Sequence, residues 1–181
     1  MQAKRIVITG GPGSGKTSLI HHLQKLGYPV MHEISREIIL EARKSGTEQL
    51  FLEDPILFSE KLLKGRFNQY EEASSISSPL LFYDRGLVDI VAYLDYAGTD
   101  YPQKFIDLCN EHRYDRVFVL PPWEEIYHSD NERYESYSQA TSIYNMLKSS
   151  YEKFGYIIRE IKPGTIEERV EQILNFIQNE N

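Results

Sequence analysis

The sequence predicts an α/β protein in which five strands form a mostly parallel sheet between two layers of helices. Short runs of β-branched and other apolar residues, typical of buried parallel strands, alternate along the chain with segments whose apolar residues have helical spacing. A glycine-rich loop joins the first such run to the first helical segment. Because 181 residues are enough for one domain with a substantial core, we expect residues 1–181 to form a single domain.

The first strand, residues 4–9, leads into a loop that matches G-x-x-x-x-G-K-[ST] without a mismatch. Glycines let the backbone curl so that several N–H groups point inward, and the N-terminus of the following helix also favours negative charge. Lys16 adds a positive charge near the β- and γ-phosphates, and the Thr17 hydroxyl can bind Mg²⁺. The sequence therefore predicts a phosphate-binding loop for a nucleotide with Mg²⁺. Its expected contact residues are Gly10, Gly11, Pro12, Gly13, Ser14, Gly15, Lys16, Thr17 and Ser18.

The second strand, residues 28–33, ends in Glu33, and a helix follows from Ser35 to the stop at Gly46. Ligands of open α/β sheets bind outside the C-terminal ends of the strands, so Glu33 is a candidate substrate contact. Arg36, in the first turn of this helix, is a candidate phosphate contact. The structural alternative for Glu33 is a solvated carboxylate or a cap of the helix that starts at Ser35.

The third strand, residues 80–84, follows a mostly helical stretch in which Asp54-Pro55 is a typical helix start. The strand closes with Asp84, which we expect to reach Mg²⁺ directly or through water. Arg85 follows as a candidate phosphate clamp, because guanidinium groups hold phosphates in planar, bidentate contacts. Asp89, one turn into the next helix (87–97), is placed to reach back to the site or to pair with Arg85. The structural alternative is an Asp-Arg surface pair.

The fourth strand, residues 114–122, ends in two prolines, and a polar segment from Trp123 to Arg133 follows. In small phosphoryl-transfer enzymes, a segment at this place closes over the phosphates and brings a basic residue. We therefore expect a lid over about residues 123–135, with Arg133 as its basic group and His128 as the second candidate; the alternative is a solvated linker. A long helix (134–154), a fifth strand (156–161), a loop and a closing helix (166–178) complete the pattern.

These motifs together resemble the P-loop kinase-like ATPases related to the kinase domain of NadR, often classed as AAA-type domains. The residues that carry the resemblance are Gly10–Thr17, Glu33–Glu37, Phe82–Gly86, Tyr114–Trp123 with the segment that follows through Arg133, and Gly164–Val170. The resemblance implies the strand order 2-3-1-4-5 with a helical lid. A wider similarity to nucleoside and nucleotide kinases implies that Glu33 contacts the acceptor hydroxyl and that Asp84 and Arg85 serve the phosphates. It also implies that the loop at Gly164 and Thr165 lines the adenine pocket.

The composition of the chain argues against several classes of protein. The net charge is −7 with no basic cluster, which argues against a dedicated nucleic-acid surface. The single cysteine, Cys109, excludes an intramolecular disulfide and a multi-cysteine metal site. No apolar run approaches the ~20 residues of a membrane span, and nothing at the N-terminus has the pattern of a signal peptide. We therefore expect a cytoplasmic protein; the pattern leaves the oligomeric state open.

Our leading hypothesis is an ATP-dependent kinase for a small-molecule acceptor. In it Lys16, Glu33, Asp84, Arg85 and Arg133 carry phosphoryl transfer, Glu33, Arg36 and Arg85 bind the acceptor, and Thr17 and Asp84 hold Mg²⁺. ATP is favoured over GTP because no Asn-Lys-x-Asp motif is present. The alternative is an ATPase or GTPase switch that acts on a protein or lipid partner, with the aromatic stretch after the lid as contact surface. A third reading is a protein that only binds nucleotide.

Overall fold

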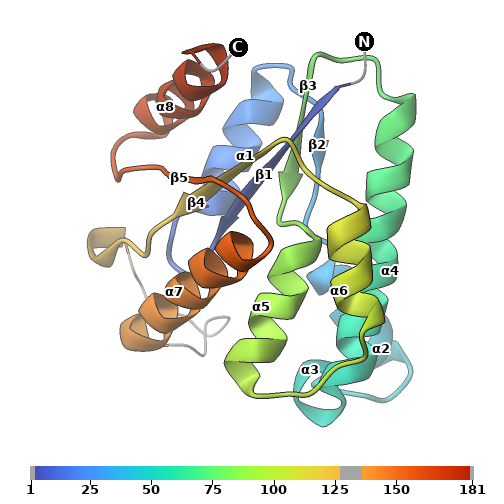
Figure 1. Cartoon of the computed structure of the whole chain (residues 1–181). Helices are drawn as coiled ribbons and strands as arrows, with labels where there is room; N and C mark the ends of the chain where they lie inside the picture. The colour runs from blue at the N-terminus through green and yellow to red at the C-terminus, as the bar shows by residue number, and fades with distance from the viewer. Residues whose placement is uncertain (1–2, 127–135, 180–181) are drawn as a thin grey trace.

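The centre of the structure, a computed structural model that describes residues 3–126 and 136–179, is a five-stranded sheet (Figure 1). All of its strand pairings are parallel, and the strand order is β2-β3-β1-β4-β5. Both the predicted sheet and its predicted order are therefore confirmed. The strands are β1 (Lys4–Gly10), β2 (Val30–Met31), β3 (Leu80–Asp84), β4 (Arg116–Leu120) and β5 (Ile158–Glu160).

The helices alternate with these strands along the chain, as the apolar spacing predicts (Figure 1). They are α1 (Lys16–Lys25), α2 (Ser35–Lys44), α3 (Leu50–Glu53), α4 (Pro55–Glu72), α5 (Leu87–Ala97), α6 (Lys104–Glu111), α7 (Tyr137–Lys153) and α8 (Ile166–Asn179). Two short 3₁₀ helices, η1 (Ala73–Ser75) and η2 (Glu124–Ile126), are also present.

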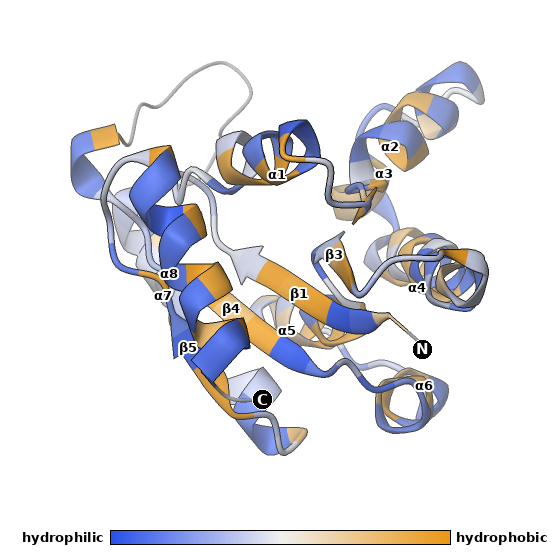
Figure 2. Ribbon diagram, turned by 90° about the horizontal axis from the view of Figure 1, so that it is seen from above, coloured by the Kyte–Doolittle hydropathy of each residue, from blue (hydrophilic) through white to orange (hydrophobic). Residues whose placement is uncertain are grey.

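The two faces of the sheet bury different helices, because successive side chains of a strand point to opposite faces. Ile6 and Ile8 of β1 pack with the apolar residues of α1 and α8 in one cluster. Val7, between them, belongs to a second cluster on the other face, built largely from α4, α5, α6 and the end of α7. Figure 2 shows the hydrophobic middle of β1 between these layers. The result is the predicted three-layer α/β arrangement.

Helix starts follow local hydrogen bonding. The Asp54 side chain accepts a hydrogen bond from the Leu57 N–H (2.9 Å), with Pro55 in the first turn of α4, so the start predicted at Asp54-Pro55 is confirmed. Helix α7 begins at Tyr137 because Ser136 caps it, exchanging hydrogen bonds with Gln139.

The edge strands β2 and β5 are shorter than the predicted residues 28–33 and 156–161. Each pairs with only one neighbour, β2 with β3 and β5 with β4, so fewer ladder hydrogen bonds fix their ends. Most of the predicted lid, including His128 and Arg133, lies outside the described residues and stays a prediction. Among the described helices, none combines the length and the apolar character that crossing a bilayer requires.

Candidate functional site

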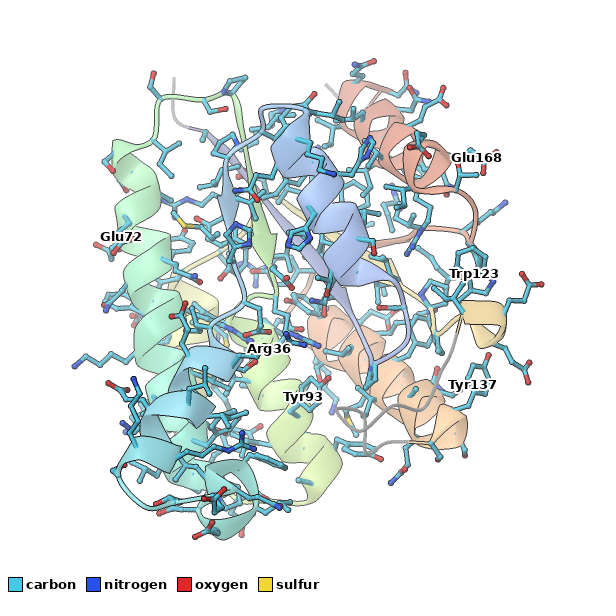
Figure 3. All side chains as sticks on the ribbon, turned by 180° about the vertical axis from the view of Figure 1, so that it is seen from behind. Arg36, Glu72, Tyr93, Trp123, Tyr137 and Glu168 are labelled. Carbon is cyan, nitrogen blue, oxygen red and sulfur yellow. The ribbon has the colours of Figure 1, made fainter. Side chains whose placement is uncertain are left out.

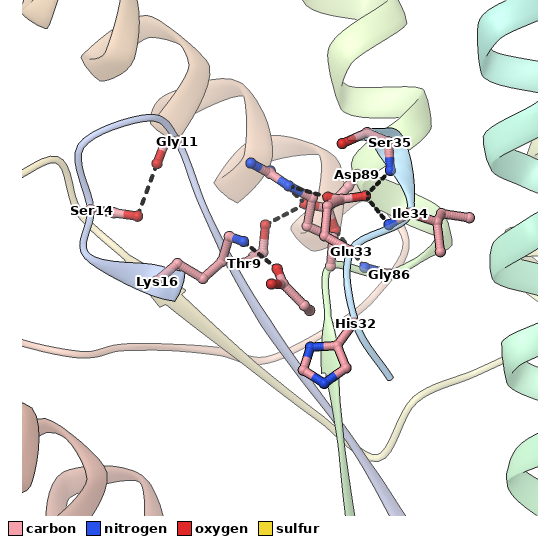
Figure 4. A network of polar contacts seen from close by, with 12 residues as sticks. Thr9, Gly11, Ser14, Lys16, His32, Glu33, Ile34, Ser35, Gly86 and Asp89 are labelled. Atoms are coloured by element: carbon pink, nitrogen blue, oxygen red, sulfur yellow. Dashed lines mark hydrogen bonds and ion pairs between the residues drawn. The ribbon is translucent and has the colours of Figure 1, made fainter. Parts of the chain in front are cut away.

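The candidate residues gather at one edge of the sheet. Because all strands are parallel, their C-terminal ends share this edge. The glycine-rich loop follows β1, Glu33 follows β2 after one intervening residue, and Asp84 is the last residue of β3. Ile8 of β1 is in register with Asp84, which brings the loop and this carboxylate together. Figure 4 shows the resulting cluster of polar side chains.

The loop between β1 and α1 has the geometry of an anion-binding nest. Gly13 (φ 72°) and Gly15 (φ 71°) adopt left-handed backbone conformations. Its carbonyl oxygens are bound by the surrounding structure: Gly11 accepts from Ser14 Oγ (2.9 Å) and Gly13 from the Trp123 N–H (3.4 Å). In contrast, the N–H groups of residues 13–18 donate to none of the described residues. This row of N–H groups at the start of α1 fits a bound phosphate.

Lys16 lies at the base of this nest and is buried. Its ammonium group forms an ion pair with Asp84 Oδ1 (Figure 4). Burial and the nearby Arg85 guanidinium lower the pKa of Lys16 below its ordinary value, although the Asp84 carboxylate opposes this shift. A polyphosphate with its metal ion would offer both members of this pair new partners.

Glu33 joins Arg66 of α4 to Arg85, which lies in the turn between β3 and α5. Its carboxylate accepts hydrogen bonds from Arg66 Nη2 at 3.0 and 3.1 Å and forms an ion pair with Arg85 Nε at 2.7 Å. Burial alone would raise the pKa of Glu33, but Arg66, Arg85 and Lys16 outweigh it and lower this pKa to about 2. The carboxylate also accepts from the N–H groups of Ile34 and Ser35, so it caps α2 as the structural alternative expected (Figure 4).

Arg85 has φ 73° and is the one described non-glycine residue with a positive φ. A left-handed conformation costs about 1 to 2 kcal/mol for such a residue, and strained backbone of this kind is concentrated at functional sites. The side chain lies between two carboxylates, since it contacts Glu33 and, through Nη1, Asp89 Oδ1 at 3.4 Å. The possible Asp89–Arg85 pairing is therefore present.

The other predicted site residues lie at the starts of helices α1, α2 and α8. Thr17 and Ser18 are exposed in the first turn of α1, and Arg36 is exposed in the first turn of α2 (Figure 3). Thr165 caps α8: its N–H donates to Glu168 Oε2 (2.8 Å), and its Oγ1 accepts from the Glu168 N–H (3.2 Å). The proposed roles of these residues, and of Gly164 beside them, remain predictions.

Two buried arginines were not predicted. Arg66 of α4 donates from Nη1 to the Gly86 carbonyl (2.8 Å) in addition to binding Glu33. Arg169 of α8 donates from Nη2 to the Ser14 carbonyl (2.7 Å), and its guanidinium lies 6.0 Å from the centre of the Trp123 ring. Both sit within the apolar stripe of an amphipathic helix. An arginine on the buried face of a helix needs a buried partner, and this is the signal that was available in the sequence.

A nucleotide with Mg²⁺ fits the residues present. The N–H groups of the loop and Lys16 suit phosphate oxygens, and Asp84 and Thr17 offer the oxygen ligands that Mg²⁺ prefers. No group of three or more His, Cys, Asp or Glu side chains suited to a metal occurs in the described part of the chain.

The sheet order and the nest together define a protein with the three-layer fold of P-loop NTPases. A family model described as "AAA domain" matches residues 5–169, and the chain belongs to this family. The predicted membership of an AAA-type P-loop family is thereby confirmed. No curated protein shows significant sequence similarity to the chain.

Solved structures share the fold at low sequence identity. Deoxyadenosine kinase from M. mycoides with bound products has a TM-score of 0.69 and 17% identity over 97% of this chain and 99% of its own. NadR in complex with NR has a TM-score of 0.72 and 18% identity over 98% of this chain, which spans 51% of NadR. Shikimate kinase from Acinetobacter baumannii has a TM-score of 0.60 and 17% identity over 99% of this chain and 95% of its own. Identities this low establish a common fold and leave the substrate open.

Proposed function

We propose that this protein is an ATP-dependent kinase that transfers a phosphoryl group to a hydroxyl of a small molecule. The observation that carries the proposal is the pairing of cations with carboxylates at adjacent strand ends, Lys16 with Asp84 and Arg85 with Glu33. These pairs lie beside a row of N–H groups that fits a polyphosphate. The structural similarity to deoxyadenosine kinase and to shikimate kinase, two kinases with different acceptors, supports the reaction class without selecting a substrate.

Phosphoryl transfer requires positioning and charge stabilisation more than covalent chemistry. When bound, ATP supplies the phosphoryl group and Mg²⁺ offsets its negative charge. The loop N–H groups and Lys16 hold the phosphates, and Asp84 offers a ligand to the metal ion. Arg85, with five N–H donors in a planar fork, is suited to the oxygens on which charge develops during transfer.

Glu33 is better suited to orienting the acceptor than to deprotonating it. A carboxylate whose pKa lies near 2 is ionised at neutral pH but is a weak base. It can still accept a hydrogen bond from an acceptor hydroxyl and so direct the oxygen towards the phosphorus. Early deprotonation of the acceptor hydroxyl by a strong base is not required, because phosphoryl transfer passes through a loose transition state in most analyses.

The charge of the cluster favours an uncharged acceptor. Three cations, Lys16, Arg66 and Arg85, face three carboxylates, Glu33, Asp84 and Asp89, so these six groups are balanced. An acceptor that already carries a phosphate would bring two more negative charges to this balanced group. This supports nucleosides and other neutral hydroxyl compounds ahead of nucleoside monophosphates.

The test is a screen with ATP labelled in the γ-phosphate, Mg²⁺ and a panel of nucleosides, nucleoside monophosphates and hydroxy acids. We expect a labelled product with at least one neutral hydroxyl compound and a turnover at least about tenfold lower in Glu33→Gln. Glu37→Gln removes an exposed carboxylate in the first turn of α2, the helix that follows Glu33, and as the matched control it should keep full turnover. Clear nucleotide binding without any phosphorylated product would argue against the proposal.

The alternative of a switch with an aromatic contact surface has less support. Among the described tyrosines that follow the lid, Tyr144, Tyr151 and Tyr156 are buried in the core, and Tyr137 is 36% exposed. Three of these four rings therefore pack inside the protein, and the exposed ring of Tyr137 alone does not make an aromatic surface for a partner. Slow hydrolysis alone that a macromolecular fraction stimulates would favour the switch.

A further inference from the structure

Asp89 is the centre of a buried polar network behind the candidate site. It lies in the first turn of α5, and the residue has no exposed surface. Its Oδ1 accepts from the Thr9 hydroxyl and from Arg85 Nη1 (3.4 Å). Its Oδ2 accepts from the Gly86 N–H (2.8 Å) and the Tyr151 hydroxyl (2.6 Å). Figure 4 shows Asp89 between Thr9 and Gly86.

The donors come from three parts of the fold. Thr9 belongs to β1, immediately before the phosphate-binding loop, and Tyr151 comes from α7. Burial and the Asp89 carboxylate raise the pKa of Tyr151 well above its ordinary value, so its hydroxyl stays protonated and donates. Asp89 therefore fixes the turn at Arg85 relative to the strand that carries the loop.

Backbone contacts also hold the turn formed by Arg85 and Gly86. The Arg85 N–H donates to the Ile8 carbonyl (3.1 Å), and Arg66 donates to the Gly86 carbonyl (2.8 Å). A Cβ on Gly86 would lie 2.8 Å from the Tyr151 hydroxyl oxygen, so a side chain at this position would displace that hydroxyl. A left-handed residue persists only where its surroundings over-determine it, and these contacts do so for Arg85.

We propose that Asp89 is a positioning residue that holds the Arg85 guanidinium at the phosphate site, with the Thr9 and Tyr151 hydroxyls fixing the carboxylate. The inference rests on the proposed function, which gives Arg85 its phosphate. Asp89 does not itself contact substrate: it is fully buried, and its oxygens already have four donors. Its effect on phosphate binding passes through Arg85.

The first test needs no ligand. The Nε–H of Arg85, bound to Glu33 in the structure, is assigned in a ¹H–¹⁵N spectrum by its loss in Arg85→Lys. In Asp89→Asn we expect this signal to shift and its exchange with water to become at least about tenfold faster. Asp95→Asn is the matched control, because Asp95 lies on the same helix and accepts a hydrogen bond from the Tyr101 hydroxyl. An unchanged Arg85 signal in Asp89→Asn would overturn the inference.

The second test asks whether the effect passes through Arg85. We expect Asp89→Asn to weaken binding of a non-hydrolysable ATP analogue with Mg²⁺ at least about tenfold more than binding of ADP. This difference should vanish in an Arg85→Ala background, as a double-mutant cycle requires. A loss that persists in that background would assign Asp89 a merely structural role.

Two further outcomes keep the inference separate from the proposed function. If Asp89→Asn fails to fold, Tyr151→Phe removes one donor, keeps the carboxylate and should shift the Arg85 signal in the same direction; no shift would overturn the inference. If the protein binds no nucleotide, the proposed function fails, and the spectrum of Arg85 still decides whether Asp89 positions it.

Discussion

At the scale of single residues, the charge state of the site depends on how buried groups of opposite charge stabilise one another. Arg66 is buried, and its guanidinium keeps its charge because Glu33 lies 3.0 Å away. Arg66 and Arg85 in turn hold Glu33 ionised against the effect of burial. Removing one member of such a group leaves the other as an uncompensated buried charge, which is much more costly than the pair itself.

The lowered pKa of Glu33 predicts a pH dependence of stability. The folded value of about 2 lies below the ordinary 4.5, so the stabilisation is fully present above pH 4.5 and is lost as the pH falls towards 2. At about 1.4 kcal/mol per pKa unit, it amounts to about 3 kcal/mol. Glu33→Gln should therefore lower the free energy of unfolding by about 3 kcal/mol at pH 7, measured by urea denaturation.

The pH series separates this effect from a general loss of packing. Between pH 4.5 and the onset of acid unfolding, the wild-type protein should lose stability more steeply than Glu33→Gln, so the two curves converge. Glu71→Gln, an exposed carboxylate on α4, should follow the wild-type curve. Parallel curves for the wild type and Glu33→Gln would show that Glu33 does not titrate as proposed.

At the scale of elements, the phosphate-binding loop is held by segments from far along the chain. A Cβ on Gly15 would lie 2.7 Å from Arg169 Nη1, and one on Gly11 would lie 3.1 Å from the Ala140 carbonyl of α7. Side chains at Gly11 and Gly15 would therefore force α7 and the Arg169 side chain of α8 to shift away from the loop. Figure 3 shows Trp123 and Glu168 on the side of the molecule where α8 meets this region.

We predict that Arg169→Ala weakens nucleotide binding without removing any residue of the loop. Loss of the guanidinium leaves the buried Ser14 carbonyl without its donor and opens space beside Gly15. An unsatisfied buried acceptor costs about 1–3 kcal/mol, so we expect a comparable loss in the free energy of unfolding and weaker binding of an ATP analogue. Denaturation and calorimetry measure the two effects.

Gln172→Ala is the control for this variant. Gln172 lies one turn further along α8 and binds the Lys162 backbone through both ends of its amide. Its loss should alter stability slightly and leave nucleotide affinity unchanged. Equal nucleotide affinities for the wild type and Arg169→Ala would show that the hydrogen bond from Arg169 of α8 to the Ser14 carbonyl does not shape the loop.

At the scale of the whole molecule, the fold places the site at one edge of the sheet while the rest of the sheet supports it. The binding of a nucleotide should therefore raise the stability of the entire fold. Free ligand at about 100 times its Kd adds about 2.7 kcal/mol. For a protein of this size, this corresponds to an increase in Tm of roughly 5–11 °C.

We predict such an increase with an ATP analogue and Mg²⁺, measured by differential scanning calorimetry. Lys16→Ala should abolish the increase, because the loop then lacks its cation for the phosphates. Lys25→Ala, an exposed lysine in the last turn of the same helix, should retain it. If neither ATP nor GTP analogues raised the Tm of the wild-type protein, the nucleotide site itself would be refuted.

The sequence by itself determined the strands and the nest, since these depend on patterns within short segments, whereas the order of the strands came from the family resemblance. Apolar runs and helical spacing locate β3 and α5 to the residue, and the loop motif implies its own backbone geometry. The positions of Asp84 and Arg85 followed, because parallel strands bring their C-terminal ends to one edge.

Only the tertiary structure decided which side chains complete the site. Arg66, Tyr151 and Arg169 are 33, 62 and 155 residues from the groups they bind, and no local pattern encodes a contact across such a separation. The partners of Glu33 and its lowered pKa were likewise decided only by the tertiary structure, because a pKa depends on burial and on charges brought close by folding. Local patterns thus located the phosphate-binding loop, whereas packing of distant helices set the electrostatics around it.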